Sequence, residues 1–138
     1  MSVSERISPV LGRFVIAWFF LSEAWWRLNN WDGTLALLQA QHIAHGVPVL
    51  AVSVLIMVLG GLSIGLGFHA RAGALLLFAF MAAVSYAVYD YWNIPDQHAR
   101  DAAYDLFVRN VAIAGGLLFI VGMGPGRFAL DNSGGRSR

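Results

Sequence analysis

The feature that most constrains this chain is a run of twenty-three uncharged residues, GVPVLAVSVLIMVLGGLSIGLGF, between Gly46 and Phe68. As an α-helix at about 1.5 Å per residue it would be roughly 34 Å long, enough to cross the hydrocarbon core of a bilayer. In hydrocarbon, backbone polar groups must be bonded within a helix or a closed barrel, and a charge at depth needs a partner or a purpose. The run therefore predicts an integral membrane protein.

The composition of the chain narrows the class further. Its 138 residues are 58% hydrophobic and 12% charged, which is too apolar for an ordinary soluble domain and too short for two domains. A formal net charge of +1 gives no basic surface for nucleic acid. We expect the partners to be the lipid bilayer together with a partner protein subunit or a second copy in a homo-oligomer.

Three further apolar segments complete the predicted bundle. The uncharged stretch Phe14–Ser22 is too short to cross a bilayer, so the first span must extend toward or beyond Glu23. The fourth span must begin near Tyr104 and carry Arg109 inside it for the same reason. We predict an all-α integral membrane four-helix bundle that forms one domain over residues 1–131, with a flexible tail at 132–138. The spans are expected at about 7–28, 46–68, 71–92 and 104–124.

The arginines near the span ends predict the orientation, because Lys and Arg are enriched in cytoplasmic loops. One side carries Arg6, Arg13, Arg71, Arg127, Arg136 and Arg138, and the other carries Arg27, Arg100 and Arg109. Both termini are therefore expected in the cytoplasm. The outer loops are the long ones, and we expect a short interfacial helix over Thr34–Ala44 and irregular structure over Asn93–Ala103. Gly61 and Gly65 share one helix face, which predicts close helix packing.

Charged residues in the outer half of the bundle form the main candidate site. Glu23 and Arg27 are four residues apart, as are Asp105 and Arg109, so each pair shares one face of its helix. If the first and fourth spans pack together, Glu23 would pair with Arg109 and leave Asn110 and nearby tyrosines to hold a polar ligand head. The alternative interpretation is a structural ion-pair network that fixes helix register.

Aromatic residues at the outer end of the third span offer a second set of ligand contacts. Tyr86, Tyr89, Tyr91 and Trp92 would form a flat wall with hydroxyl donors for a quinone, or would serve as anchors at the membrane interface.

Other cofactors have little support in the sequence. His42 and His45 lack a third metal ligand, and no histidine falls in the middle of a predicted span. The chain also has no cysteine. We therefore expect no metal, haem or iron–sulfur cluster.

Two stretches of the sequence are similar to a known family. Residues 59–74, LGGLSIGLGFHARAGA, resemble the "GG-x-x-L-x-x-G-x-x-x-R-x-x-A" hairpin of the DoxX family, and Gly124–Asp131, GPGRFALD, resembles its closing "GPGR-x-S-L-D" signature. Residues 109–116 fit its final helix, "N-x-A-x-x-G-G". The resemblance implies a four-helix protein of the bacterial or archaeal cytoplasmic (inner) membrane, related to subunits of a thiosulfate:quinone oxidoreductase.

These observations lead to three functional hypotheses. The first is a membrane subunit of a quinone-linked oxidoreductase complex, with no catalytic residue assigned and with its enzymatic status open. Its quinone or small anionic substrate would be bound by Glu23, Arg27, Tyr86, Asp105, Arg109 and Asn110. The second is a non-enzymatic anchor or assembly subunit that docks a partner protein. The third is a small-molecule transporter.

Overall fold

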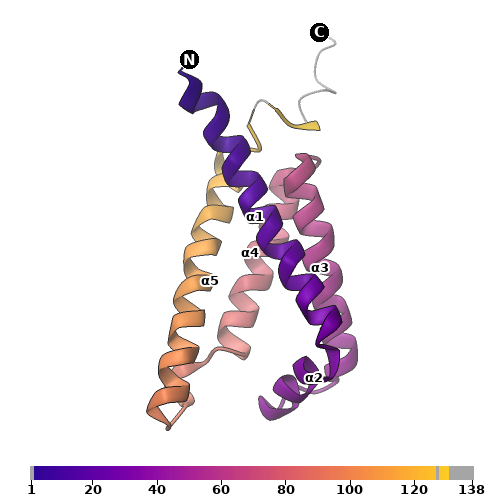
Figure 1. Cartoon of the computed structure of the whole chain (residues 1–138), viewed down its shortest axis with the longest axis vertical. Helices are drawn as coiled ribbons and strands as arrows, with labels where there is room; N and C mark the ends of the chain where they lie inside the picture. The colour runs from indigo at the N-terminus through magenta and orange to yellow at the C-terminus, as the bar shows by residue number, and fades with distance from the viewer. Residues whose placement is uncertain (1, 127, 131–138) are drawn as a thin grey trace.

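The computed structural model describes residues 2–126 and 128–130, and within them the chain is helical. The elements in chain order are α1 (Val3–Asn29), α2 (Trp31–Ala40), α3 (Gly46–Leu66), α4 (Ala70–Ala87), the 3-10 turn η1 (Tyr91–Asn93) and α5 (Gln97–Met123). The four long helices run side by side, and α2 lies across one end of the bundle (Figure 1). The start of α1 and the end of α5 lie at the opposite end.

Within the described residues, four segments are long and apolar enough to cross a membrane, which confirms the predicted all-α membrane fold. They are Val3–Asn29, Gly46–Leu66, Ala70–Asn93 and Gln97–Met123. Large apolar side chains such as Trp18, Leu55 and Phe119 are more than half exposed on the outside of the bundle. Such a surface is expected to contact lipid. The side of the membrane on which the termini lie stays a prediction.

The core of the bundle is filled from all four long helices. Phe20, Ile64, Leu77 and Leu117 have no exposed surface, and each comes from a different helix. Glycines allow the helices to approach closely. A Cβ added at Gly60 of α3 would lie 2.5 Å from Cγ of Leu77 on α4, so only glycine fits there.

The predicted close packing at Gly61 and Gly65 is confirmed. A Cβ at Gly61 would lie 3.2 Å from Cγ of Leu21, and one at Gly65 would lie 3.2 Å from Cβ of Ala17. These small residues therefore pack α3 directly against α1. The helices are neighbours in the order α1, α3, α4, α5, whereas α1 and α5 contact one another little. Figure 1 shows α1 and α5 diverging toward the end where α2 lies.

The fourth span begins earlier than the sequence analysis predicted. Asp96 caps α5 by accepting a hydrogen bond of 3.0 Å from the backbone N–H of Ala99, so the helix begins at Gln97. Our expectation of irregular structure over Asn93–Ala103 is therefore wrong in its second half. Arg109 lies twelve residues along this helix, or about 18 Å from its start.

Other boundaries also differ from the prediction. Ser2 and Glu5 form a capping box, which starts α1 at Val3 rather than near residue 7. The helix expected over Thr34–Ala44 begins at Trp31 and ends at Ala40, before the left-handed residue His42 with φ 56°. The third span is interrupted, because α4 ends at Ala87 and η1 follows it.

Arg13 is buried rather than facing lipid headgroups. It is only 4% exposed, and its Nη1 and Nη2 atoms donate to the carbonyl oxygens of Pro125 (2.8 Å) and Phe128 (2.6 Å). The guanidinium thus ties α1 to the segment after α5. The predicted tail 132–138, and Arg127, Arg136 and Arg138 of the orientation argument, lie outside the described residues.

Candidate functional site

Four of the six predicted site residues line one small pocket between α1, α4 and α5. They are Glu23, Arg27, Arg109 and Asn110. The pocket is closed on its inner side by apolar side chains that include Phe20 and Met57. Its volume is about 10 Å³, close to the space that one water molecule needs. The fold therefore brings together four residues that were predicted to share one site.

The carboxylate in this pocket is bonded within its own helix. Arg27 Nη1 donates to Glu23 Oε2 at 2.7 Å and to the Glu23 carbonyl oxygen at 3.2 Å. Both side chains are more than two-thirds buried. The spacing along α1 predicted that the two side chains share one helix face, and the ion pair between them leaves Glu23 with its charge already matched.

Arg109 has no carboxylate partner among the described residues. Its Nε is buried without a hydrogen-bond partner, and its guanidinium carbon lies 5.4 Å from the ring centroid of Phe19. The predicted ion pair between Arg109 and Glu23 is therefore wrong, because α1 and α5 diverge at this level and Arg27 holds Glu23. Asp105 is exposed and forms no ion pair with Arg109 either.

Phe19 is a site residue that the sequence analysis missed. It lies four residues before Glu23, so both side chains project from one face of α1. A guanidinium within about 6 Å of an aromatic face is attracted to the negative face of the ring. The spacing of Phe19 and Glu23 was the available signal, but an aromatic residue in a membrane span is usually a lipid or core contact.

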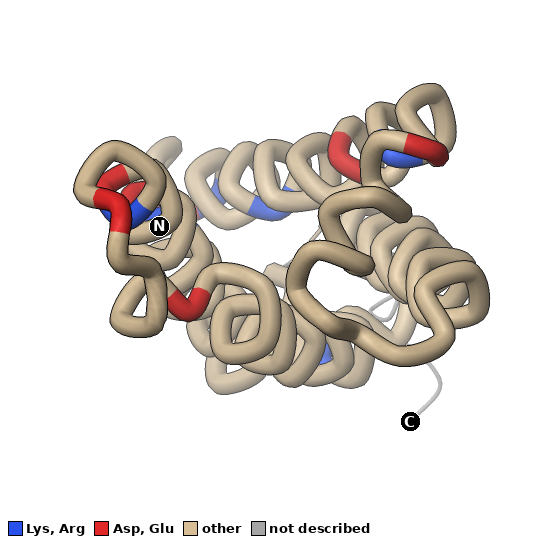
Figure 2. Tube along the Cα trace, turned by 90° about the horizontal axis from the view of Figure 1, so that it is seen from below, with Lys and Arg blue, Asp and Glu red and all other residues tan. Residues whose placement is uncertain are grey.

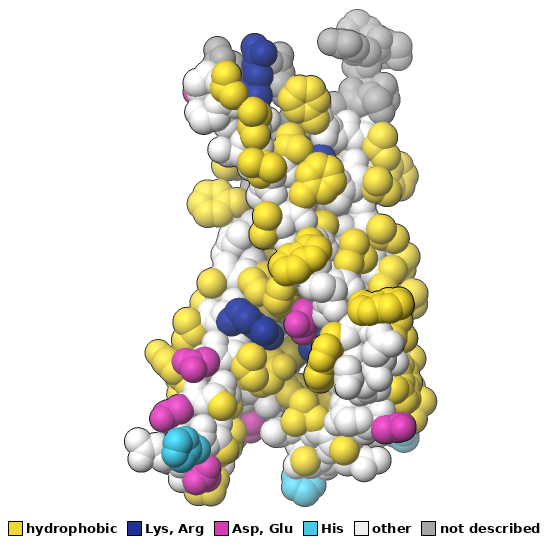
Figure 3. Space-filling model, in the orientation of Figure 1, with side chains coloured by type: hydrophobic (Ala, Val, Ile, Leu, Met, Phe, Trp, Pro, Cys, Tyr) yellow, Lys and Arg dark blue, Asp and Glu magenta, His cyan; other side chains and the backbone are white. Residues whose placement is uncertain are grey.

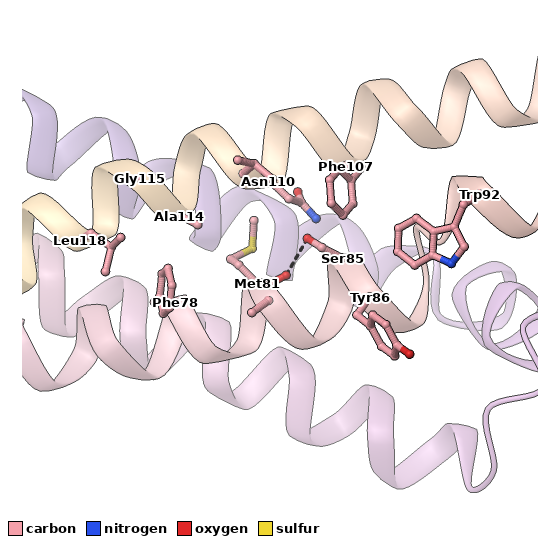
Figure 4. A pocket seen from close by; sticks show the side chains of 12 residues that line it. Phe78, Met81, Ser85, Tyr86, Trp92, Phe107, Asn110, Ala114, Gly115 and Leu118 are labelled. Carbon is pink, nitrogen blue, oxygen red and sulfur yellow. Dashed lines mark hydrogen bonds between the residues drawn. The ribbon is translucent and has the colours of Figure 1, made fainter.

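Asn110 lies where the charged pocket meets a second, larger cavity. It is 2% exposed, and together with Met81 it lines both spaces. The second cavity is a groove of about 540 Å³ between α4 and α5, shown in Figure 4. Its lining is almost entirely apolar, and Ser85 in it donates its hydroxyl to the Met81 carbonyl oxygen at 2.7 Å.

Tyr86 lies in this groove and not with the charged residues. Its side chain is 75% exposed, and its ring centroid lies 6.0 Å from that of Trp92. Aromatic rings do gather at this end, where Tyr91 packs edge-on against Tyr104 and Phe107. The predicted single site thus divides into a charged pocket and an aromatic groove on opposite sides of the contact between α4 and α5.

The comparison with known proteins decides the family. The sequence profile of the SURF4 family matches residues 34–136. The chain belongs to the SURF4 family. It is 26% identical over 133 residues to the inner membrane protein YqjF of Escherichia coli (strain K12), a match that covers 95% of each chain. No solved structure matches it.

A eukaryotic relative matches over a shorter stretch. The Surfeit locus protein 4 homolog of Schizosaccharomyces pombe is 34% identical over 68 residues, which are 48% of this chain and 22% of that protein. The predicted location in the inner membrane is confirmed by the bacterial relative and by the four helices able to span a bilayer.

The SURF4 match overturns the resemblance to DoxX proteins. It also overturns the hypothesis of a quinone-linked oxidoreductase subunit, which depended on that resemblance. The sequence motifs that resemble the DoxX family are explained by the local backbone geometry of this chain. Gly67 and Gly124 have φ values of 71° and 80°, which glycine adopts readily at helix ends. Such turn residues recur in unrelated helical hairpins and do not discriminate between families.

Proposed function

We propose that this SURF4-family protein is a membrane-embedded binding protein that holds an anionic group at Arg109, in the opening between α1 and α5. The ligand is an amphiphile with a carboxylate or phosphate head. The observation that supports the proposal is that Arg109 has no carboxylate partner among the described residues, although a carboxylate lies in the same pocket.

The charges of the pocket favour an anion. Two guanidinium groups and one carboxylate line it, and Glu23 is bonded to Arg27 at 2.7 Å. One positive charge on Arg109 is therefore left over. A charge at the centre of a bilayer costs about 2.5–3.5 kcal/mol on insertion scales, and the Phe19 ring offsets only about 1–2 kcal/mol of this. An anionic ligand would offset the remaining cost of burying this charge.

The position of Arg109 favours an amphiphile over a ligand that enters from water. Figure 3 shows basic and acidic side chains close together in a hollow on the face where α1 and α5 diverge, with apolar side chains around them. The pocket behind them has space for about one water. The anion would therefore bind at the mouth, on the Nη atoms, with its apolar part in the surrounding lipid.

A second candidate function is assembly with a partner subunit or a second copy. A carboxylate on a neighbouring membrane helix would also neutralise Arg109. The exposed face of α5 favours close approach of such a helix, because nothing lies within 4 Å of a Cβ added at Gly115 or Gly122. The predicted partner protein or homo-oligomer stays a proposal of this kind.

Native mass spectrometry of the protein purified in mild detergent separates these functions. We expect the wild type to retain an anionic lipid that Arg109→Gln loses. Arg6→Gln is the matched control, because Arg6 is an exposed arginine at the other end of α1. Displacement of the lipid by added inorganic phosphate would show that the anionic headgroup alone is enough for binding at Arg109. Loss of a second protein chain in Arg109→Gln would support assembly instead, and equal lipid retention in all three proteins would contradict the proposal.

A further inference from the structure

We propose a second ligand site, independent of Arg109, on the outer face of α4 and α5. Its ligand is a phospholipid with a phosphoethanolamine head. One acyl chain would lie in the groove between the two helices, and the phosphate would bind Arg100 beside η1.

The groove has the dimensions of an acyl-chain site. It encloses about 540 Å³, and the residues along α5 that line it run from Phe107 to Leu118. The eleven residue-to-residue steps between them correspond to about 16 Å of helix. This length is close to half of the roughly 30 Å hydrocarbon core, which is the depth of one leaflet.

The groove exists because its floor is built from small residues. Ala82 on α4 and Ala114 and Gly115 on α5 line it, and nothing lies within 4 Å of a Cβ added at Gly115. Figure 4 shows larger side chains such as Phe78 and Leu118 at one end and Tyr86 and Trp92 at the other. The space between them is left for a flexible apolar chain.

A second, partly polar pocket lies at the Trp92 end of the groove. Trp92 lines both spaces, and the second space of about 460 Å³ is completed by Tyr91, Asn93, Ile94, Pro95 and Arg100. The Trp92 ring lies 5.9 Å from that of Phe107 and 5.3 Å from that of Tyr91. Clusters of Trp and Tyr are typical of the headgroup level. An apolar groove with a partly polar pocket beside it at this level matches the acyl chain and the headgroup of a lipid.

The charges around this pocket favour a zwitterionic head. Arg100 donates from Nε to the Ile94 carbonyl oxygen (3.0 Å) and from Nη2 to the Pro95 carbonyl oxygen (3.1 Å), which fixes the guanidinium and leaves Nη1 for a phosphate oxygen. The side-chain amide of Asn93 donates to Asp90 Oδ2 at 3.1 Å, and Asp96 follows Pro95 in the sequence. In Figure 2 acidic positions gather near this end of the bundle. Carboxylates beside the pocket would attract an ammonium group and repel a purely anionic head.

Two glycines of α5 give a matched pair of variants. Gly115→Phe would fill the groove, and Gly122→Phe would add the same side chain outside it. At both positions nothing lies within 4 Å of an added Cβ, so each new side chain begins in open space. Ala114→Leu blocks the same groove by a smaller change and serves as a second variant.

The test titrates the purified protein with palmitoyl-oleoyl phosphatidylethanolamine or phosphatidylglycerol and counts bound lipid by native mass spectrometry. We expect one phosphatidylethanolamine per chain, bound in preference to phosphatidylglycerol. Gly115→Phe and Ala114→Leu should lose it, Gly122→Phe should keep it, and Arg100→Gln should weaken it about threefold.

Several results would overturn this second site. Equal phosphatidylethanolamine binding by Gly115→Phe and Gly122→Phe would show that the groove is not the binding site. Equal binding of phosphatidylethanolamine and phosphatidylglycerol would contradict the assignment of the headgroup. Loss of a bound protein chain from Gly115→Phe would show a helix in the groove instead. Arg109→Gln should leave phosphatidylethanolamine binding unchanged, so failure of the Arg109 site and failure of this site are distinguishable.

Discussion

The guanidinium carbon of Arg109 lies 5.4 Å from the ring centroid of Phe19, and this ring faces it where a carboxylate was expected. The ring belongs to α1 and the arginine to α5, two helices that otherwise contact one another little. The contact therefore links the helices at the level of the charged pocket and leaves the positive charge of Arg109 without a matching negative charge.

This contact predicts measurable coupling between the two residues. Phe19→Leu should lower the free energy of unfolding by about 1 kcal/mol more in the wild type than in an Arg109→Gln background, because the cation–π attraction exists only in the former. Thermal unfolding in detergent of the wild type, the two single variants and the double variant measures this difference. Phe119→Leu, at an exposed position of α5, is the control. Strictly additive effects of the two substitutions would show that the contact contributes nothing.

Neutralising the carboxylate should strengthen anion binding. Glu23→Gln removes the partner of Arg27, so the charged pocket would hold two unmatched positive charges in place of one. We expect retention of anionic lipid to rise severalfold in native mass spectra. Asp105→Asn is the control, because Asp105 is exposed and makes no salt bridge with the described residues. A fall in retention would mean that Glu23 itself holds the ligand.

The buried Arg13 should be important for stability. Arg13→Gln removes two charge-assisted hydrogen bonds, to Pro125 and Phe128, and each contributes about 1.5–3 kcal/mol. We expect a loss of about 3 kcal/mol in thermal unfolding and faster proteolysis near Phe128. Arg6→Gln should change neither measurement. If Arg13→Gln behaves like Arg6→Gln, the packing of the segment after α5 against α1 does not depend on the Arg13 guanidinium.

The contact between α3 and α4 gives a prediction about packing. Gly60→Ala would place a methyl group 2.5 Å from Cγ of Leu77 and should destabilise the bundle by about 1–3 kcal/mol. Gly122→Ala adds the same methyl group where nothing lies within 4 Å, so its thermal unfolding should match that of the wild type. Partial rescue of Gly60→Ala by Leu77→Ala would assign the loss to this contact.

Much of the fold could be predicted from the sequence, because lipid imposes a simple rule on span length and polarity. The uncharged run Gly46–Phe68 is α3 with two residues of turn, and the glycine pair at Gly61 and Gly65 correctly indicated close packing. The start of α5 was missed because the cap at Asp96 lies in a charged, Pro-containing segment that resembles a loop.

The partners of the charged residues could be predicted only within one helix. Four-residue spacing placed Glu23 beside Arg27 and Asp105 beside Arg109, but among the described residues only Glu23 and Arg27 form an ion pair. Side-chain packing across the whole bundle determines which helices are neighbours. Arg109 contacts Phe19 because of this packing. The burial of Arg13 has the same origin, since its two carbonyl partners lie more than a hundred residues later in the chain.

An experimental density map of the protein purified with its bound lipids would test the proposed anion site at Arg109 by direct observation. We expect an oxyanion of a bound amphiphile within about 3 Å of an Nη atom of Arg109, in the opening between α1 and α5. A map in which Arg109 instead pairs with Glu23 or Asp105, with no ligand at the mouth of the pocket, would contradict it.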